Sequence, residues 1–178
     1  KANLQVLIFN QRSIEEILEV ILTIGRIVSA EDKAQKLVDG YKKRLNLLRE
    51  KSDKIQNKPK VYFEEWDDPT FSGIRWVSEL IEIAGGEDIF TNKSHGKLAM
   101  EREIQWSDVI KKNPDVILAS WCGKPVDIDS IKKREGWNEI TAIKNNRIHE
   151  IDSSIILQPG PACLTEGLKV IKSLIREQ

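Results

Sequence analysis

Hydrophobic residues near the start of the chain form one short continuous run and then a periodic stretch. The run Leu4–Phe9 ends at two polar residues, which is typical of a strand buried on both faces. Apolar residues then recur at helical spacing over 14–24, in a stripe wide enough to need cover on more than one side. Ser13 and Glu16 form a capping box in front of this stretch and Gly25 follows it, so we predict a helix that ends at Gly25.

A longer and more polar periodic stretch follows, from Ser29 to about Lys54. Ser29 provides an N-cap signature, and apolar positions continue at a spacing of three or four residues. At about 1.5 Å per residue, roughly 25 residues make a helical rod of about 37 Å. Pro59 ends the charged segment that comes after the rod and marks a boundary in the chain.

Beyond Pro59, short apolar runs alternate with helical stretches. Strands are predicted at 61–64, 116–119 and 147–151, and helices at 74–84, 106–112, 128–134 and 161–176. This alternation predicts an α/β fold, a three-layer α/β/α lobe with a largely parallel sheet. Ligands of such sheets bind beyond the carboxyl ends of the strands, which here lead into the loops 66–69, 120–124 and 152–158.

These elements divide the chain into three parts. Residues 29–57 form the long connecting helix, and residues 58–178 form the C-terminal α/β lobe, which we expect to bind the ligand. Residues 1–28 hold a single β-α unit, which cannot satisfy its own strand edges and is interpreted as the last strand and helix of an incomplete N-terminal lobe. We therefore expect residues 1–25 to be covered, either by self-association with a second copy or by a separate fragment.

Composition excludes several classes of protein. With 28 Lys+Arg against 28 Asp+Glu the formal net charge is zero, which argues against a nucleic-acid partner. No apolar run approaches the roughly 18–20 residues of a transmembrane helix. Two cysteines are too few for a disulfide scaffold or a thiolate zinc cluster, and two histidines leave little for histidine-based catalysis.

Catalytic interpretations of the loops are weaker than structural ones. The carboxylates of Glu64–Asp68 would suit a metal-dependent α/β enzyme, but no histidine or further carboxylate is near in sequence, and a solvated strand end is the simpler interpretation. Cys122 follows a strand, where a nucleophile would be exposed, but it has no neighbouring base. His95 and His149 are interpreted as a loop residue and a structural residue.

Tryptophan supplies five of the aromatic residues, and three of these share one region of the predicted lobe. Trp66 and Trp121 fall in loops at the carboxyl ends of strands, and Trp76 is near the start of a helix that faces the same end. Several indoles on one rim make flat apolar walls, which are typical of a small-molecule cleft. Trp106 and Trp137 are assigned to packing.

Five segments of the chain together resemble one family. They are VYFEEWDDPTFSGIRW (61–76), AGGEDIF (84–90), SHGKLAMERE (94–103), NPDVILASWCG (113–123) and IILQPGPACL (155–164). The chain resembles the substrate-binding proteins of ABC importers, in the vitamin B12 and iron-siderophore class, and within it the cobalamin-binding subgroup. The resemblance runs through nearly all of the chain, and EEWDDP and SWCG with LQPGPA are its narrower motifs.

The resemblance implies binding and not catalysis, with no metal site and no resident cofactor. Proteins of this class have two α/β lobes joined by one long helix, hold a ligand between the lobes and deliver it to an ABC permease on the membrane. The implied ligand is a corrinoid, cobalamin, carried as transported cargo. The implied location is periplasmic, or extracytoplasmic with a membrane anchor.

The resemblance, together with the loop positions, identifies a set of candidate ligand-binding residues: Trp66, Trp121, Cys122, Ser153, Leu157 and Gln158, with Arg75 and Trp76 as further candidates. Indole faces would pack on the flat corrin, and the serine and glutamine would meet its amide side chains. Asp108 is carried over as the permease-docking residue, because the family's glutamate falls at Ser107. Some relatives have a disulfide whose first position here is Ala84, so that bridge is absent. Cys122 and Cys163 either pair with each other or are free.

An iron-siderophore or haem is the rival ligand within the same class. A siderophore site needs cationic groups for an anionic chelate, and a haem site needs an axial tyrosine or histidine. The candidate loops offer Trp, Ser and Gln, with Arg75 and Lys124 as the nearby cations. The pattern therefore favours a nearly neutral ligand.

Overall fold

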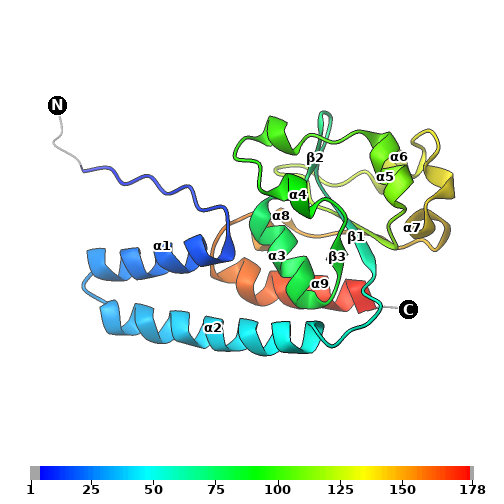
Figure 1. Ribbon diagram of the computed structural model, residues 1–178. Helices are drawn as coiled ribbons and strands as arrows, with labels where there is room; N and C mark the ends of the chain where they lie inside the picture. Colours follow the sequence, from blue (N-terminus) through cyan, green and yellow to red (C-terminus); the bar gives the residue numbers. More distant parts are fainter. Residues whose placement is uncertain (1–4, 177–178) are drawn as a thin grey trace.

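The chain begins with a pair of long helices that lie side by side. The computed structural model describes residues 5–176, and Figure 1 shows α1 (Ile14–Ile27) running back along α2 (Glu31–Ser52). Ser13 caps α1 as predicted, since its hydroxyl accepts a hydrogen bond from the Glu16 amide at 3.2 Å.

The predicted end of the first helix at Gly25 is wrong. Gly25 is buried inside α1, and a Cβ built on it would lie 2.4 Å from the Cβ of Ala34 in α2. The glycine is therefore needed for close approach of the two helices, and α1 continues for two more residues. The predicted cap at Ser29 is also wrong, because Ser29 adopts a left-handed backbone (φ 54°) in the connection and Ala30 occupies the N-cap of α2.

The predicted strand Leu4–Phe9 does not form. Leu4 lies outside the described residues, and residues 5–10 have no regular structure and are exposed. Val6 and Ile8 have exposed fractions of 76% and 88%. A strand needs a neighbour to take its backbone hydrogen bonds, and no strand of residues 5–176 pairs with this segment.

The sheet is built around β1 (Lys60–Asp67). β4 (Val116–Ala119) pairs parallel with β1, and β5 (Ile148–Glu150) pairs parallel with β4, as the alternating pattern predicts. β3 (Glu87–Asp88) lies parallel to the start of β1, while β2 (Thr70–Ser72) forms an antiparallel hairpin with its end. The resulting strand order, β2-β1-β4-β5, is that of a largely parallel sheet.

Helices cover both faces of this sheet, which confirms the predicted three-layer α/β/α fold. The remaining elements are α3 (Arg75–Ala84), α4 (Thr91–Ser94), η1 (Ala99–Arg102), α5 (Trp106–Lys112), α6 (Ile128–Lys132), η2 (Trp137–Glu139), α7 (Thr141–Lys144), α8 (Ser153–Ile156), the π-helical turn η3 (Cys163–Gly167) and α9 (Leu168–Arg176). No helix in residues 5–176 has both the length and the apolar character needed to cross a membrane.

Successive side chains of β1 point into two separate hydrophobic cores. Val61 and Phe63 pack on one face with residues of α1, α2, α3 and α9. Tyr62 packs on the other face, in a core that contains Trp121 and the fully buried Trp137. This alternation is the period of two expected of a strand covered on both sides.

Candidate ligand-binding site

The candidate residues gather where the parallel strands end. Trp66 is near the carboxyl end of β1, Trp121 follows β4 after one residue, and α8 begins shortly after β5. Because these three strands are parallel, their carboxyl ends meet at one edge of the sheet. Trp66 differs from its prediction in one respect: it lies in β1 and not in a loop. It pairs with Phe71 of β2, and the turn of the hairpin is Asp68 and Pro69, with a cis bond between them.

A pocket of about 330 Å³ lies at this edge and includes four of the predicted residues. Its lining is mostly apolar and comprises Glu65, Trp66, Phe71, Trp76, Ala99, Cys122 and Leu157. Trp76 is fixed in place because its indole N–H donates to the carbonyl oxygen of Ile156 in α8 at 2.9 Å. Phe71 and Ala99 were not predicted, since β2 and η1 give no clear sequence pattern.

A second hollow, of about 490 Å³, lies on the same edge and includes two more predicted residues. It is lined by Trp121, Gly123, Lys124, Pro125, Glu150, Asp152 and Ser153. The last two predicted residues line neither hollow: Arg75 pairs with Glu79 at 2.9 Å, and Gln158 is exposed. The structure thus brings six of the eight candidates to one edge of the sheet.

Lys124 links the two tryptophans that border these hollows. Its ammonium nitrogen lies 4.4 Å from the ring centre of Trp66 and 4.8 Å from that of Trp121. The same nitrogen is 2.8 and 3.0 Å from the two carboxylate oxygens of Asp67. Partial burial acts to raise the pKa of Asp67, but the hydrogen bonds from Lys124 and the backbone outweigh it and lower that pKa. The cation next to the indoles is therefore already neutralised by a carboxylate.

A buried ion pair between Glu64 and Arg134 holds the indole of Trp121 in place. Glu64 has no exposed surface, and its carboxylate makes two hydrogen bonds with the guanidinium of Arg134, at 2.5 and 2.9 Å. The same carboxylate accepts hydrogen bonds from the Tyr62 hydroxyl at 2.9 Å and from the Trp121 indole N–H at 3.2 Å. Burial, with the adjacent Glu64 charge, raises the pKa of Tyr62 well above its usual range, so the phenol remains a donor. Trp121 is itself only 4% exposed.

A second paired carboxylate borders the apolar pocket. Glu65 is bound by the guanidinium of Arg102 at 2.6 and 2.8 Å and also accepts from the backbone N–H of Ile74 at 2.9 Å. Together with the Glu64 and Asp67 pairs, this leaves three of the four carboxylates of the predicted acidic loop paired with cations, while Asp68 is exposed. Within residues 5–176 no three His, Cys, Asp or Glu side chains converge as a metal site would require.

The two cysteines are free and differ in their surroundings. Cys122 is exposed at the pocket, whereas Cys163 is buried at the start of η3. Burial raises the pKa of the Cys163 thiol, which donates to the carbonyl oxygen of Gly160 at 3.1 Å. The two therefore do not form the disulfide that was one of the two expectations for them.

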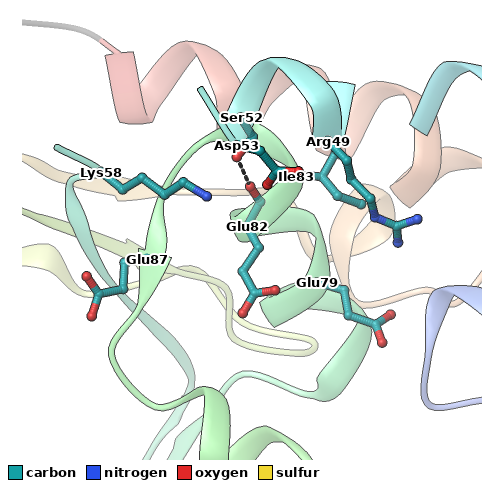
Figure 2. Close-up of a pocket in the computed structure, with 9 residues that line it drawn as sticks. Arg49, Ser52, Asp53, Lys58, Glu79, Glu82, Ile83 and Glu87 are labelled. Carbon is teal, nitrogen blue, oxygen red and sulfur yellow. Dashed lines mark hydrogen bonds between the residues drawn. The ribbon is translucent and has the colours of Figure 1, made fainter. Parts of the chain in front are cut away.

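A further pocket, of about 320 Å³, lies away from these residues. It is shown in Figure 2 and is lined by Arg49, Ser52, Asp53, Lys58, Glu79, Glu82, Ile83, Gly86 and Glu87. Lys58 and Glu87 flank the beginnings of β1 and β3, so this pocket is at the amino end of the sheet. Its polar lining and its position do not match the predicted ligand cleft.

Asp108 lies apart from the pocket, in α5. Its side chain is 47% exposed and pairs with Lys111 at 3.4 Å, one turn further along the helix. The carboxylate is therefore on the surface, and its assignment to permease docking remains a prediction.

Comparison with known proteins identifies the family. The sequence profile of the periplasmic binding protein family matches residues 1–155, and the chain belongs to this family. An uncharacterised ABC transporter substrate-binding lipoprotein of Bacillus subtilis, YvrC, is 29% identical over 98% of this chain and 54% of its own length. A vitamin B12-binding protein of Vibrio parahaemolyticus is 24% identical over 89% of this chain and 55% of its own length. The chain thus spans about half the length of these relatives.

Solved structures confirm the fold. A Staphylococcus epidermidis protein described as a possible iron-binding, periplasmic solute-binding protein superimposes with a TM-score of 0.77 and 26% identity, over 94% of this chain and 64% of the other. These relatives are solute-binding proteins and not enzymes.

Proposed function

We propose that this chain is part of the substrate-binding component of an ABC importer and that its ligand is a corrinoid, cobalamin. The proposal is supported by family membership and by a B12-binding relative that covers most of the chain. The pocket at the carboxyl ends of the strands supplies aromatic and aliphatic walls, as a large flat ligand requires. Trp66 and Trp121 would border the corrin, with Cys122, Leu157 and Ser153 around it.

The pairing of the nearby cations is the observation that favours cobalamin most. Three cations near the pocket, Arg75, Arg102 and Lys124, each have a carboxylate partner within 3 Å. An anionic iron chelate would have to break a pair to gain any of these three cations, whereas a nearly neutral corrinoid would not. The residues lining the pocket also include no tyrosine or histidine that could serve as an axial ligand to haem iron.

An iron chelate is the alternative ligand. It is supported by the resemblance to the S. epidermidis protein, whose description names iron. Arg75 lies beside the pocket residue Trp76 on α3 and is the least constrained of the three cations, since its side chain is 43% exposed. In this alternative Arg75 would leave Glu79 and meet the chelate.

The wider assembly follows from the same proposal. Residues 58–178 would form one lobe of the protein, 29–57 the connecting helix, and 1–28 the end of the other lobe. The ligand would lie between the lobes, and the protein would work outside the cytoplasm, in the periplasm or on a membrane anchor. The membrane anchor is supported by the relative that is named a lipoprotein. Asp108 would contact the permease.

The exposed apolar residues of the N-terminal segment support the proposal that another lobe or chain packs against it. Four consecutive apolar residues, 6–9, are exposed, and Ile24 and Ile27 of α1 are about half exposed as well. Burying an isoleucine or leucine side chain stabilises a protein by roughly 1.5–3 kcal/mol, so we propose that another lobe or a second copy covers this surface. Light scattering of the 178-residue chain should show self-association; a strictly monomeric chain would contradict this part of the proposal.

The proposal is tested by removing two indoles, that of Trp66 in the apolar pocket and that of Trp121 in the second hollow. Trp66→Ala with Trp121→Ala should weaken cobalamin binding by at least tenfold, measured by calorimetric titration on a protein that carries both lobes. Trp106→Phe is the matched control, because Trp106 is outside both hollows. Circular dichroism checks that the variants are folded, and Trp66→Ala alone serves if the double variant is not. Unchanged cobalamin affinity in a folded variant would contradict this placement of the ligand.

A further inference from the structure

A groove between α2 and α9 combines an apolar floor with a concentration of positive charge. The two helices both pack against α3, and a hollow of about 420 Å³ remains between them. Its lining comprises Gly40, Lys43, Arg44, Leu47, Leu48, Lys51, Leu168, Lys169 and Lys172. Five of these nine residues are cationic and none is acidic, although the chain as a whole has no net charge.

The positive charge in the groove is uncompensated. Within residues 5–176 no ion pair joins any of the five cations to a carboxylate. The acidic residues of the same part of α2, Asp39 and Glu50, do not line the groove. Desolvation, followed by the like charges of Arg176, Lys51 and Arg44, lowers the pKa of Lys172. The like charges around Lys172 would favour a nearby anion.

The spacing of the residues on α2 makes this surface long and straight. Gly40, Lys43, Leu47 and Lys51 follow one another by three or four positions, with Arg44 next to Lys43, so they share one face of the helix over about 17 Å. A side chain at Gly40 would meet nothing within 4 Å, so this end of the groove is open. Leu47, at its centre, is 50% exposed.

We infer that this groove is a contact site for a bilayer surface rich in anionic phospholipid. Lipid phosphates would lie over the lysines and the arginine, and the glycerol and upper acyl region would meet Leu47. A bilayer matches a straight cationic stripe on two adjacent helices without needing a shaped pocket. In Figure 1, α2 and α9 lie below the sheet while the β1–β2 hairpin points up, so lipid contact leaves the candidate ligand pocket in solvent. The inference does not depend on which ligand that pocket takes.

The test is flotation of the protein with vesicles of two compositions. The protein should bind vesicles of phosphatidylglycerol mixed with phosphatidylcholine and not vesicles of phosphatidylcholine alone. Changing all five groove cations (Lys43, Arg44, Lys51, Lys169 and Lys172) to Gln should lower the affinity about 100-fold or more, since each cation near an anionic surface contributes appreciably. Leu47→Gln should lower it about fivefold with no change of charge.

A control with the same loss of charge separates the groove from general attraction. The control variant changes five lysines that lie outside the groove and off both of its helices to Gln: Lys93, Lys97, Lys112, Lys132 and Lys133. It should retain affinity within about tenfold, because screening limits what distant charges contribute. The inference is overturned if the two vesicle types bind equally, if the control loses as much as the groove variant, or if Leu47→Gln has no effect. Binding to poly-glutamate but not to the mixed vesicles would also overturn it, in favour of an acidic protein partner.

Discussion

Replacing Glu64 tests the buried network that holds Trp121 at the candidate site. Glu64→Gln keeps the shape of the side chain but removes its charge, which leaves the Arg134 guanidinium with 5% exposure and no counter-ion. The two rings next to that guanidinium, Trp106 and Trp137, lie 4.9 and 4.5 Å from its central carbon and offset only part of the loss.

The expected magnitude follows from the burial of both partners. Breaking a buried pair by removing one partner costs about 3–5 kcal/mol, and the amide retains a hydrogen-bond acceptor for Tyr62, so we expect about 3 kcal/mol. In a chain of this size that loss lowers the melting temperature by about 6–12 °C. It is a large part of the roughly 5–15 kcal/mol by which domains are stable.

Urea unfolding followed by tryptophan fluorescence measures this loss. Glu139→Gln is the matched control, because Glu139 pairs with Lys144 on the surface, where the two side chains are 67% and 54% exposed respectively. This exposed pair should contribute less than about 1 kcal/mol to the free energy of unfolding. Changing Glu64 and Arg134 together to leucine should cost less than Glu64→Gln alone, since no unpaired charge is left. A loss below about 1 kcal/mol for Glu64→Gln, with an unchanged urea slope, would refute the reasoning.

Two further predictions concern helix packing and pH. Gly25→Ala should lower the free energy of unfolding by about 1–3 kcal/mol, because its methyl group would overlap α2. Gly40→Ala should raise the free energy of unfolding by about 0.5–1 kcal/mol, because its methyl group meets no neighbour and alanine favours the helix. Urea midpoints distinguish the two signs. The folded-state pKa of Asp67 is lowered, so its contribution to stability is present above the unfolded pKa of about 4 and is lost as pH falls through the folded value. Asp67→Asn should therefore lose less stability than the parent protein as the pH falls through this range. Urea midpoints that depend on pH identically in the two proteins would argue against the pairing of Asp67 with Lys124.

Local patterns in the sequence were enough to predict most of the α/β lobe. The strand Val116–Ala119 and the helix Trp106–Lys112 were predicted with the bounds they have. The strand is a continuous apolar run that follows Pro114, and the helix ends just before Asn113. The hairpin strand β2 was missed, since three residues after a proline give no alternation to detect. The closing helix was predicted over its whole length, but its π-helical turn has no sequence signal.

The errors arose where the outcome depends on distant residues. A glycine after an apolar stretch usually ends a helix, yet Gly25 is retained inside α1 by its contact with Ala34. The run Leu4–Phe9 has the composition of a strand, but strand formation requires a neighbour that the described chain does not supply.

Contacts between residues far apart in the sequence also determined which features of the candidate site could not be predicted. The tryptophans could be placed at the edge of the sheet from strand positions alone. That Glu64 is paired with Arg134, seventy positions further along the chain, is invisible to any local pattern. The same holds for Lys124, which was predicted only as a nearby cation and proves to lie against both indoles.

The central proposal is that this protein captures a nearly neutral corrinoid for import. Calorimetric titration of the protein carrying both lobes, with cobalamin, a ferric hydroxamate and haem in parallel, tests it most directly. We predict saturable one-to-one binding of cobalamin that is tighter than that of either iron compound. Tighter binding of the hydroxamate or of haem, with cobalamin weak or unbound, would contradict the account.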